Sequence, residues 1–109
     1  MRVLVAFDPR LYREAVARMI WEVRPHLELL TIEPAGLHRE LEHFEPHLVL
    51  LNGSPARIPA AVIGWVRVTT ADQLEATACV GGRYSHIERM RVDDLLAIID
   101  EADRLVSQG

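Results

Sequence analysis

The sequence predicts an α/β domain in which helices cover both faces of a parallel sheet. The first observation is residues 48–51, a run of four apolar residues that ends at the turn residues Asn52 and Gly53. A short, wholly apolar run closed by a turn is typical of a strand buried on both faces. The second observation is that strand-like and helical segments alternate, with short links, through the first half of the chain.

The first helix has the clearest local signals. Asp8 is a favoured N-cap residue and Pro9 suits the first helical position. Pro25 disfavours helical geometry in the residue before it, and apolar residues recur at helical spacing in between. The first half of the chain is therefore expected to form strands over residues 2–6, 26–32 and 48–51, with helices from Pro9 to near Arg24 and from Pro34 to before Pro46.

The second half departs from this regular alternation. Residues 53–61 contain two prolines and are too short and broken for a good helix, so one helix is expected to be missing or shortened there. Strand-like composition then returns, and a Gly-Gly pair closes a further segment. The expected elements are strands over residues 62–70 and 84–87 and helices over residues 71–80 and 92–106.

Composition limits the domain organisation and the classes of function. A length of 109 residues suits one domain over residues 1–109, and an apolar fraction of 50% favours a folded core. The net charge is −4 and no basic stripe is present, which argues against direct binding of nucleic acid. The 12 basic residues are all arginine, so no lysine can form a Schiff base or clamp a phosphate. Cys79 is the only cysteine, which excludes a disulfide within the chain.

The start of the chain and its apolar runs bear on location. Met1 leads directly into the apolar residues 3–5, without the basic region and long apolar stretch of a signal peptide. No apolar run approaches the length of a membrane span. We therefore expect a cytoplasmic protein with no membrane partner.

Several segments, in their order and spacing, resemble the receiver domain of bacterial response regulators. They are the strand-like residues 3–5 followed by Asp8, the segment 46–52, the segment 68–71 and the segment 93–99. The resemblance covers nearly the whole chain. It implies a flavodoxin-like three-layer sandwich with a five-stranded parallel sheet in the order 2-1-3-4-5, here with the third helix missing or shortened. It also implies a role in two-component signalling.

The phosphorylation site of receivers is degenerate in this chain. Receivers take a phosphoryl group on an aspartate that ends the third strand, and the resemblance places Asn52 there. Only one of the three expected acids remains, which is too few carboxylates for a hard cation such as Mg²⁺. The resemblance therefore implies a pseudo-receiver with no catalytic residue, metal or cofactor. The other positions fall on Phe7 and Asp8 for the acid pair, Thr70 for the hydroxyl, and Glu88 or Arg89 for the lysine.

Simpler roles stay open for several of these residues. Asp8 suits a helix cap as well as a metal ligand, and Asn52 suits a plain turn as well as a ligand site. His38, His43 and His47 lack a shared helical face, which favours surface positions over a metal site.

Three functions are compatible with the sequence. The favoured one is a phosphorylation-independent interaction domain that binds a protein partner or a second copy of itself. The alternative is a small-ligand-binding domain or small enzyme that uses the strand ends near Asp8, Asn52 and Thr70. The third is a DNA-associated regulator that acts through a partner.

The missing helix predicts an apolar surface and a homodimer, because large uncovered apolar patches usually mark interfaces. The preferred surface consists of Leu50, Ile58, Val62 and Trp65. Trp65 also suits a core position. A second candidate surface consists of Ala78, Ile87, Leu95 and Ile99.

Overall fold

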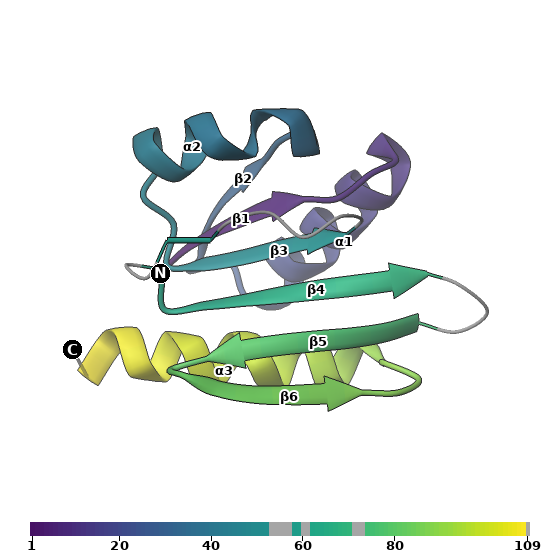
Figure 1. Ribbon diagram of the computed structural model, residues 1–109, viewed down its shortest axis with the longest axis vertical. Coiled ribbons are helices and arrows are strands. Elements are labelled where there is room, and N and C mark those ends of the chain that lie inside the picture. The colour runs from purple at the N-terminus through teal and green to yellow at the C-terminus, as the bar shows by residue number, and fades with distance from the viewer. Residues whose placement is uncertain (53–57, 60–61, 71–73, 109) are drawn as a thin grey trace.

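A single six-stranded sheet with the order β2-β1-β3-β4-β5-β6 forms the centre of the molecule (Figure 1). The computed structural model describes residues 1–52, 58–59, 62–70 and 74–108. For Thr70 it describes the backbone alone. The strands are β1 (Arg2–Ala6), β2 (Glu28–Thr31), β3 (Leu48–Asn52), β4 (Gly64–Thr70), β5 (Leu74–Val80) and β6 (Arg83–Ile87). The helices are α1 (Arg10–Val23), the 3₁₀ helix η1 (Pro34–Gly36), α2 (Leu37–His43) and α3 (Val92–Gln108).

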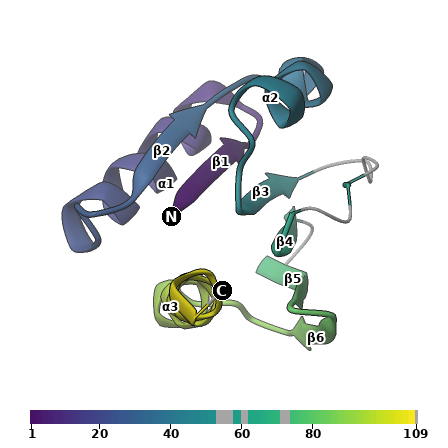
Figure 2. The same ribbon diagram turned by 90° about the vertical axis from the view of Figure 1, so that its left-hand side faces the viewer.

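The first four strands in the sheet order are parallel. Consecutive residues of β1 alternate between two buried clusters, because neighbouring side chains on a strand point to opposite faces. Val3 and Val5 belong to the cluster that α1 and α3 cover, whereas Leu4 and Ala6 belong to the cluster under α2. Figure 2 shows α1 and α3 on one side of the sheet and α2 on the other. β3 alternates in the same way, with Leu48 and Leu50 in the first cluster and Val49 and Leu51 in the second, which confirms the two-faced strand expected over residues 48–51.

The second half of the sheet is antiparallel. β4 pairs with β5 and β5 with β6, both antiparallel. The helix expected over residues 71–80 is wrong, because this segment contains β5. Its side chains follow a period of two, with Ala76, Ala78 and Val80 buried against the α3 side. The glycines expected to end a helix instead form a two-residue hairpin turn, in which Gly81 and Gly82 have φ angles of +58° and +81°.

The five-stranded parallel, flavodoxin-like sheet expected from the sequence is also wrong. A parallel return from β4 needs a crossover connection of a dozen or more residues. Only residues 71–73 separate β4 from β5, so the chain reverses direction and adds two antiparallel strands. The expectation of a missing third helix falls largely on residues 53–57 and 60–61, which lie outside the described residues. Residues 58–59 and 62–63 are not helical.

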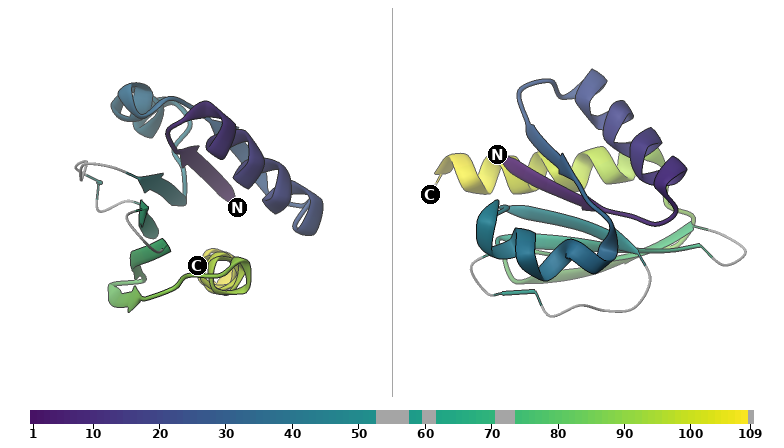
Figure 3. Two further views of the ribbon diagram at one scale, coloured as in Figure 1. Left: turned by 90° about the vertical axis from the view of Figure 1, so that its right-hand side faces the viewer. Right: turned by 90° about the horizontal axis from the view of Figure 1, so that it is seen from above.

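The three helices hold the sheet from both sides. α1 and α3 lie on the same side of the sheet, and two polar contacts join the residues just after α1 to α3. The guanidinium of Arg24 donates to both carboxylate oxygens of Asp100 at 2.8 Å, and His26 Nε2 lies 2.8 Å from Asp103 Oδ2. Figure 3 shows α2 alone on the opposite side, over the parallel strands. No helix in the described part of the chain is long and apolar enough to span a membrane.

Candidate functional site

The residue at the expected phosphoacceptor position forms a structural tie. Asn52 ends β3, and its Oδ1 accepts a hydrogen bond from the Asp8 backbone N–H at 2.9 Å. Its Nδ2 donates to the Asp8 carbonyl at 2.7 Å. Both polar atoms of the amide therefore hold the chain that follows β1. A carboxylate cannot make this pair of bonds, because it has no N–H to donate.

Asp8 does not cap α1, so the expected cap is wrong. The helix begins at Arg10, and the residue at its N-cap is Pro9, with no capping hydrogen bond from a side chain. The backbone of Asp8 is held instead by Asn52, and its side chain is exposed. The tie to β3 holds the residues after β1, and the first turn of α1 begins one residue later than the sequence pattern indicates.

A buried arginine also holds the segment between β1 and α1. Arg13 is 8% exposed, and its Nη1 donates to the carbonyl of Phe7 at 3.0 Å. Phe7 is fully buried, and its ring lies 5.0 Å from that of Tyr12. Sequence reasoning missed Arg13, although it lies three and seven residues before Val16 and Ile20, on the inner face of α1.

The remaining receiver-like positions do not lie beside Asn52 and Asp8. β6 runs in the same direction as β4, so Glu88 follows it at the same edge of the sheet as Asn52. Two strands, β4 and β5, lie between, which separates these positions by about 14 Å at the usual strand spacing. Thr70 ends β4, and its side chain lies outside the described residues. A binding role for the strand ends stays a prediction.

The histidines give no metal site among the residues that the structure describes. His38 and His43 are exposed on α2, whereas His47 is half-buried before β3. His47 Nδ1 accepts a hydrogen bond from the Arg2 backbone N–H at 2.9 Å. Burial, the Arg2 guanidinium and the terminal ammonium together lower the pKa of His47 from 6.5, in that order of importance. The neutral ring therefore acts as a backbone acceptor.

A groove of about 600 Å³ lies beside His47, between α2 and Pro59. Its charged side chains do not form a patch of one sign. Arg2 Nε donates to the Glu45 carbonyl at 2.9 Å, and the groove is lined by the acidic residues Glu42 and Glu45 as well as by Arg2. The lining therefore carries charges of both signs and defines neither an anion site nor a cation site.

The surfaces expected for dimerisation are divided by the sheet. Leu50 is fully buried in the cluster beneath α1 and α3, whereas Ile58, Val62 and Trp65 pack as half-buried residues on the α2 side. These four residues therefore form no single surface. In the second expected surface Ala78, Leu95 and Ile99 are buried in the core between β5 and α3, and only Ile87 is half-buried.

The antiparallel strands present a face that no described helix covers. α3 lies against one side of β5, and the other side of β4, β5 and β6 is free of helices in the part of the chain that the structure describes (Figures 2 and 3). Trp65, Cys79 and Tyr84 form one cross-strand row there. The Trp65 and Tyr84 rings meet edge to face across Cys79, with centroids 6.1 Å apart, and Tyr84 is 74% exposed.

A polar row runs beside the aromatic one. Arg67, Thr77 and His86 are paired across the same three strands, and Thr77 Oγ1 lies 3.4 Å from His86 Nδ1. Arg67 is half-buried, and its side chain makes no hydrogen bond or ion pair among the described residues. We call the two rows together the open face; its residues are Trp65, Cys79, Tyr84, Arg67, Thr77 and His86. The alternation of buried and polar residues over 74–80 is the sequence signal that could have revealed it.

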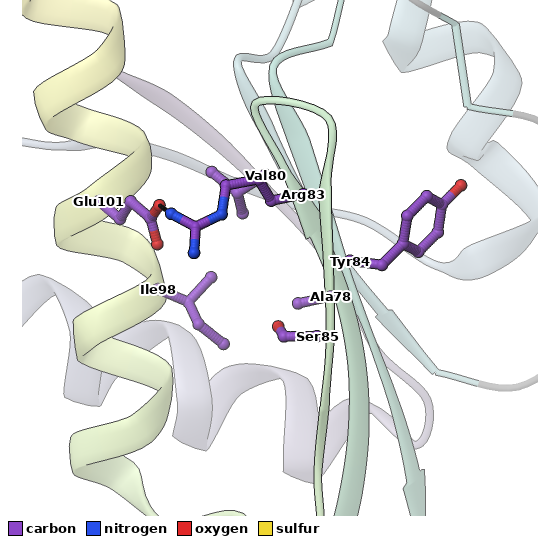
Figure 4. Close-up of a pocket in the computed structure, with 7 residues that line it drawn as sticks. All are labelled: Ala78, Val80, Arg83, Tyr84, Ser85, Ile98 and Glu101. Atoms are coloured by element: carbon purple, nitrogen blue, oxygen red, sulfur yellow. Dashed lines mark ion pairs between the residues drawn. The ribbon is translucent and has the colours of Figure 1, made fainter.

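The opposite side of the same strands is closed. A pocket of about 80 Å³ lies between the β5–β6 hairpin and α3, where Arg83 Nη1 approaches Glu101 Oε1 at 3.9 Å (Figure 4). That volume holds only two or three water molecules. Figure 4 also shows Tyr84 pointing away from α3, whereas Ala78 and Ser85 point toward it. The exposed aromatic ring therefore belongs to the open face alone.

The fold and this surface define a small α/β protein with a mixed sheet and one uncovered sheet face. No protein-family model, curated protein or solved structure matches the chain. The likeness to receiver domains thus stays a prediction, although the parallel architecture that it implied is wrong.

Proposed function

We propose that this protein is a non-catalytic interaction module that binds a protein partner through the open face. One observation carries the proposal: a sheet that is covered by α3 on one side presents Trp65, Arg67 and Tyr84 on the other. Interface centres are enriched in tryptophan, tyrosine and arginine, and these residue types dominate binding energy where they occur. The proposal places the protein in the cytoplasm.

Arg67 indicates the chemistry of the partner. Arg67 is half-buried as a residue, and its guanidinium has no acceptor among the described residues. A buried charge is costly unless it is paired, so covering this face favours a partner that brings a carboxylate or carbonyl to the guanidinium. The aromatic row supplies apolar contact area next to that charge.

The arrangement of the open face supports binding over catalysis. Cys79 lies in the aromatic row, whereas His86 lies in the neighbouring row with its Nδ1 toward Thr77. A cysteine nucleophile needs a base within hydrogen-bond reach and a group that orients that base. Binding needs only the shape and charge that the six side chains present.

Affinity capture with matched variants tests the proposal. Purified wild-type protein, Arg67→Ala and Tyr84→Ala are immobilised, and proteins retained from an extract of the source cells are quantified. Trp21→Ala is the control, because Trp21 is 59% exposed on α1 and lies outside the open face. We expect a partner that wild type and the control retain equally and that both open-face variants lose by about tenfold or more. Equal retention by all four proteins would contradict the proposal.

A further inference from the structure

We propose that two copies of this chain pair through β6, antiparallel and with Ser85 on the twofold axis, so that their sheets form one continuous twelve-stranded sheet. β6 is a sheet edge, and its outer side has no strand partner among the described residues. The proposal goes beyond the interaction function above, because the contact is made by backbone groups at the edge of the sheet and does not involve Arg67 or Trp65.

The hairpin turn decides which backbone groups point outward. Val80 and Arg83 flank the two-residue turn, and such a flanking pair exchanges both of its backbone hydrogen bonds. Hydrogen-bonded and non-hydrogen-bonded pairs then alternate along the hairpin. The backbone of Ser85 therefore forms its hydrogen bonds with Ala78 of β5. Tyr84 and His86 fall at the non-bonded positions. Their N–H and C=O groups therefore point to the free edge.

A twofold axis at Ser85 makes these free groups complementary. In that register Tyr84 lies opposite His86 of the second copy, and His86 lies opposite Tyr84 of the second copy. Both members of each pair point their backbone groups at the shared edge. The two copies can thus exchange four backbone hydrogen bonds.

The side chains agree with the same register. The two Ser85 residues meet as a non-bonded pair, in which Cα atoms approach to about 4.5 Å and small side chains fit best. Ser85 also lines the 80 Å³ pocket, which leaves room beside the axis. Tyr84 and His86 meet on the open face as an aromatic cross-strand pair, and Arg83 lies opposite Ile87, so no like charges face each other.

The described part of the molecule leaves space for this pairing. Exposed edges are usually protected by proline, a bulge or a central charge, and β6 pairs with β5 without a bulge and has neither proline nor charge over Tyr84–His86. α3 packs on β5, set back from the edge (Figure 2). The two β5 strands of the dimer lie three strand spacings apart, about 14 Å. This exceeds the 8–10 Å at which helices pack, so the α3 helices do not collide.

Variants that introduce a positive or a negative charge at Ser85 test the dimer, with the mass measured by sedimentation at micromolar concentration. We expect wild type at twice the 12.3 kDa mass of the chain. Ser85→Lys and Ser85→Glu should each sediment as monomers, because like charges meet at the axis, and their equimolar mixture should recover the dimer mass. A monomeric wild type, dimers of either single variant, or a mixture that stays monomeric overturns the proposal.

A pair of proline variants separates the two edges of the sheet. His86→Pro removes an outward N–H from β6 and should abolish the dimer. Thr31→Pro is the matched control at the β2 edge: Glu28 N–H donates to Met1 and Ile32 N–H to Val5, so Thr31 N–H points away from β1. The control should stay dimeric, and its dissociation would overturn the assignment to β6. These results are independent of Arg67, so a monomer leaves the proposed partner binding standing.

Discussion

At the scale of single residues, Asn52 and His47 show how polar side chains replace backbone partners. Asn52 ties β3 to the residues after β1 through both atoms of its amide. His47 accepts from the backbone of Arg2 through Nδ1, which is possible only while that nitrogen carries no proton. Each residue therefore makes the fold sensitive to a change of one proton or one N–H group.

Replacing Asn52 by aspartate is expected to destabilise the fold. Asn52→Asp removes the donor to the Asp8 carbonyl and sets a carboxylate against it, at a cost of about 1 kcal/mol in the free energy of unfolding. Urea denaturation measures the change, with Asn52→Ala as the comparison. A plain turn residue would tolerate aspartate, since aspartate is common in turns. Full stability of Asn52→Asp, with loss only in Asn52→Ala, would therefore contradict the tie.

His47 is expected to make stability fall in mild acid. Its folded pKa lies below the unfolded value near 6.5, so the unfolded state binds the proton first. The stabilisation is complete above pH 6.5 and is lost as the pH falls through the folded pKa. Urea denaturation between pH 8 and pH 5, about the span in which histidine titrates, measures this slope. In His47→Asn, whose Oδ1 can still accept from Arg2, the slope should be smaller; an unchanged slope would assign it to other groups.

At the scale of elements, the β5–β6 hairpin is the feature that separates this fold from the expected one. Its Gly-Gly turn reverses the chain where the sequence pattern indicates the end of a helix. The turn needs a positive φ at both central residues, which glycine adopts without steric cost. The hairpin places Tyr84 and His86 beside Cys79 and Thr77 and so completes the open face.

Substitution in this turn tests the importance of the hairpin. Gly81→Ala should lower the free energy of unfolding by about 1–2 kcal/mol, because alanine is strained at positive φ. A Cβ atom there would also lie 2.9 Å from Leu105 Cδ1. Gly36→Ala is the control, since Gly36 has a φ of −89° and nothing within 4 Å of an added Cβ. Equal stability of the two variants in urea would show that the turn conformation is not as described.

At the scale of the whole molecule, α3 connects the two halves of the sheet. It covers β5, and its polar edge reaches the end of α1 through Arg24 and Asp100. The charge-assisted hydrogen bonds to Arg24 are the main reason that the pKa of Asp100 lies below its usual 3.8. The pair thus joins the N-terminal parallel unit to the C-terminal helix.

The Arg24–Asp100 pair is expected to contribute stability that depends on pH and salt. The folded pKa of Asp100 is depressed, so its contribution is present above pH 3.8 and is lost as the pH falls through the folded value. Asp100→Asn should lower the melting temperature modestly at neutral pH, since the pair is exposed and screened. The difference from wild type should shrink in 1 M salt, where the Debye length is about 3 Å. Arg10→Gln is the control. It breaks the ion pair between Arg10 and Glu14, which lies within α1 and joins no second element.

Much of the fold could be predicted because its signals are local. The apolar runs of β1 and β3 and the helical periods of α1 and α3 each lie within one short window of sequence. The helix expected over residues 71–80 hides the open face, because its two rows form only when β5 lies between β4 and β6. Without β5 in place, Tyr84 and Arg67 have no common surface.

The sequence by itself determined the two-faced parallel core and the amphipathic helices, since the spacing of apolar residues fixes which faces are buried. The tertiary structure alone decided the direction of β5, the partner of Asn52 and the rows of the open face. These features depend on contacts between residues far apart in the chain, such as Asn52 and Asp8, which are 44 positions apart. Strand direction and cross-strand neighbours are set by such contacts and by the length of the connection, not by local propensity.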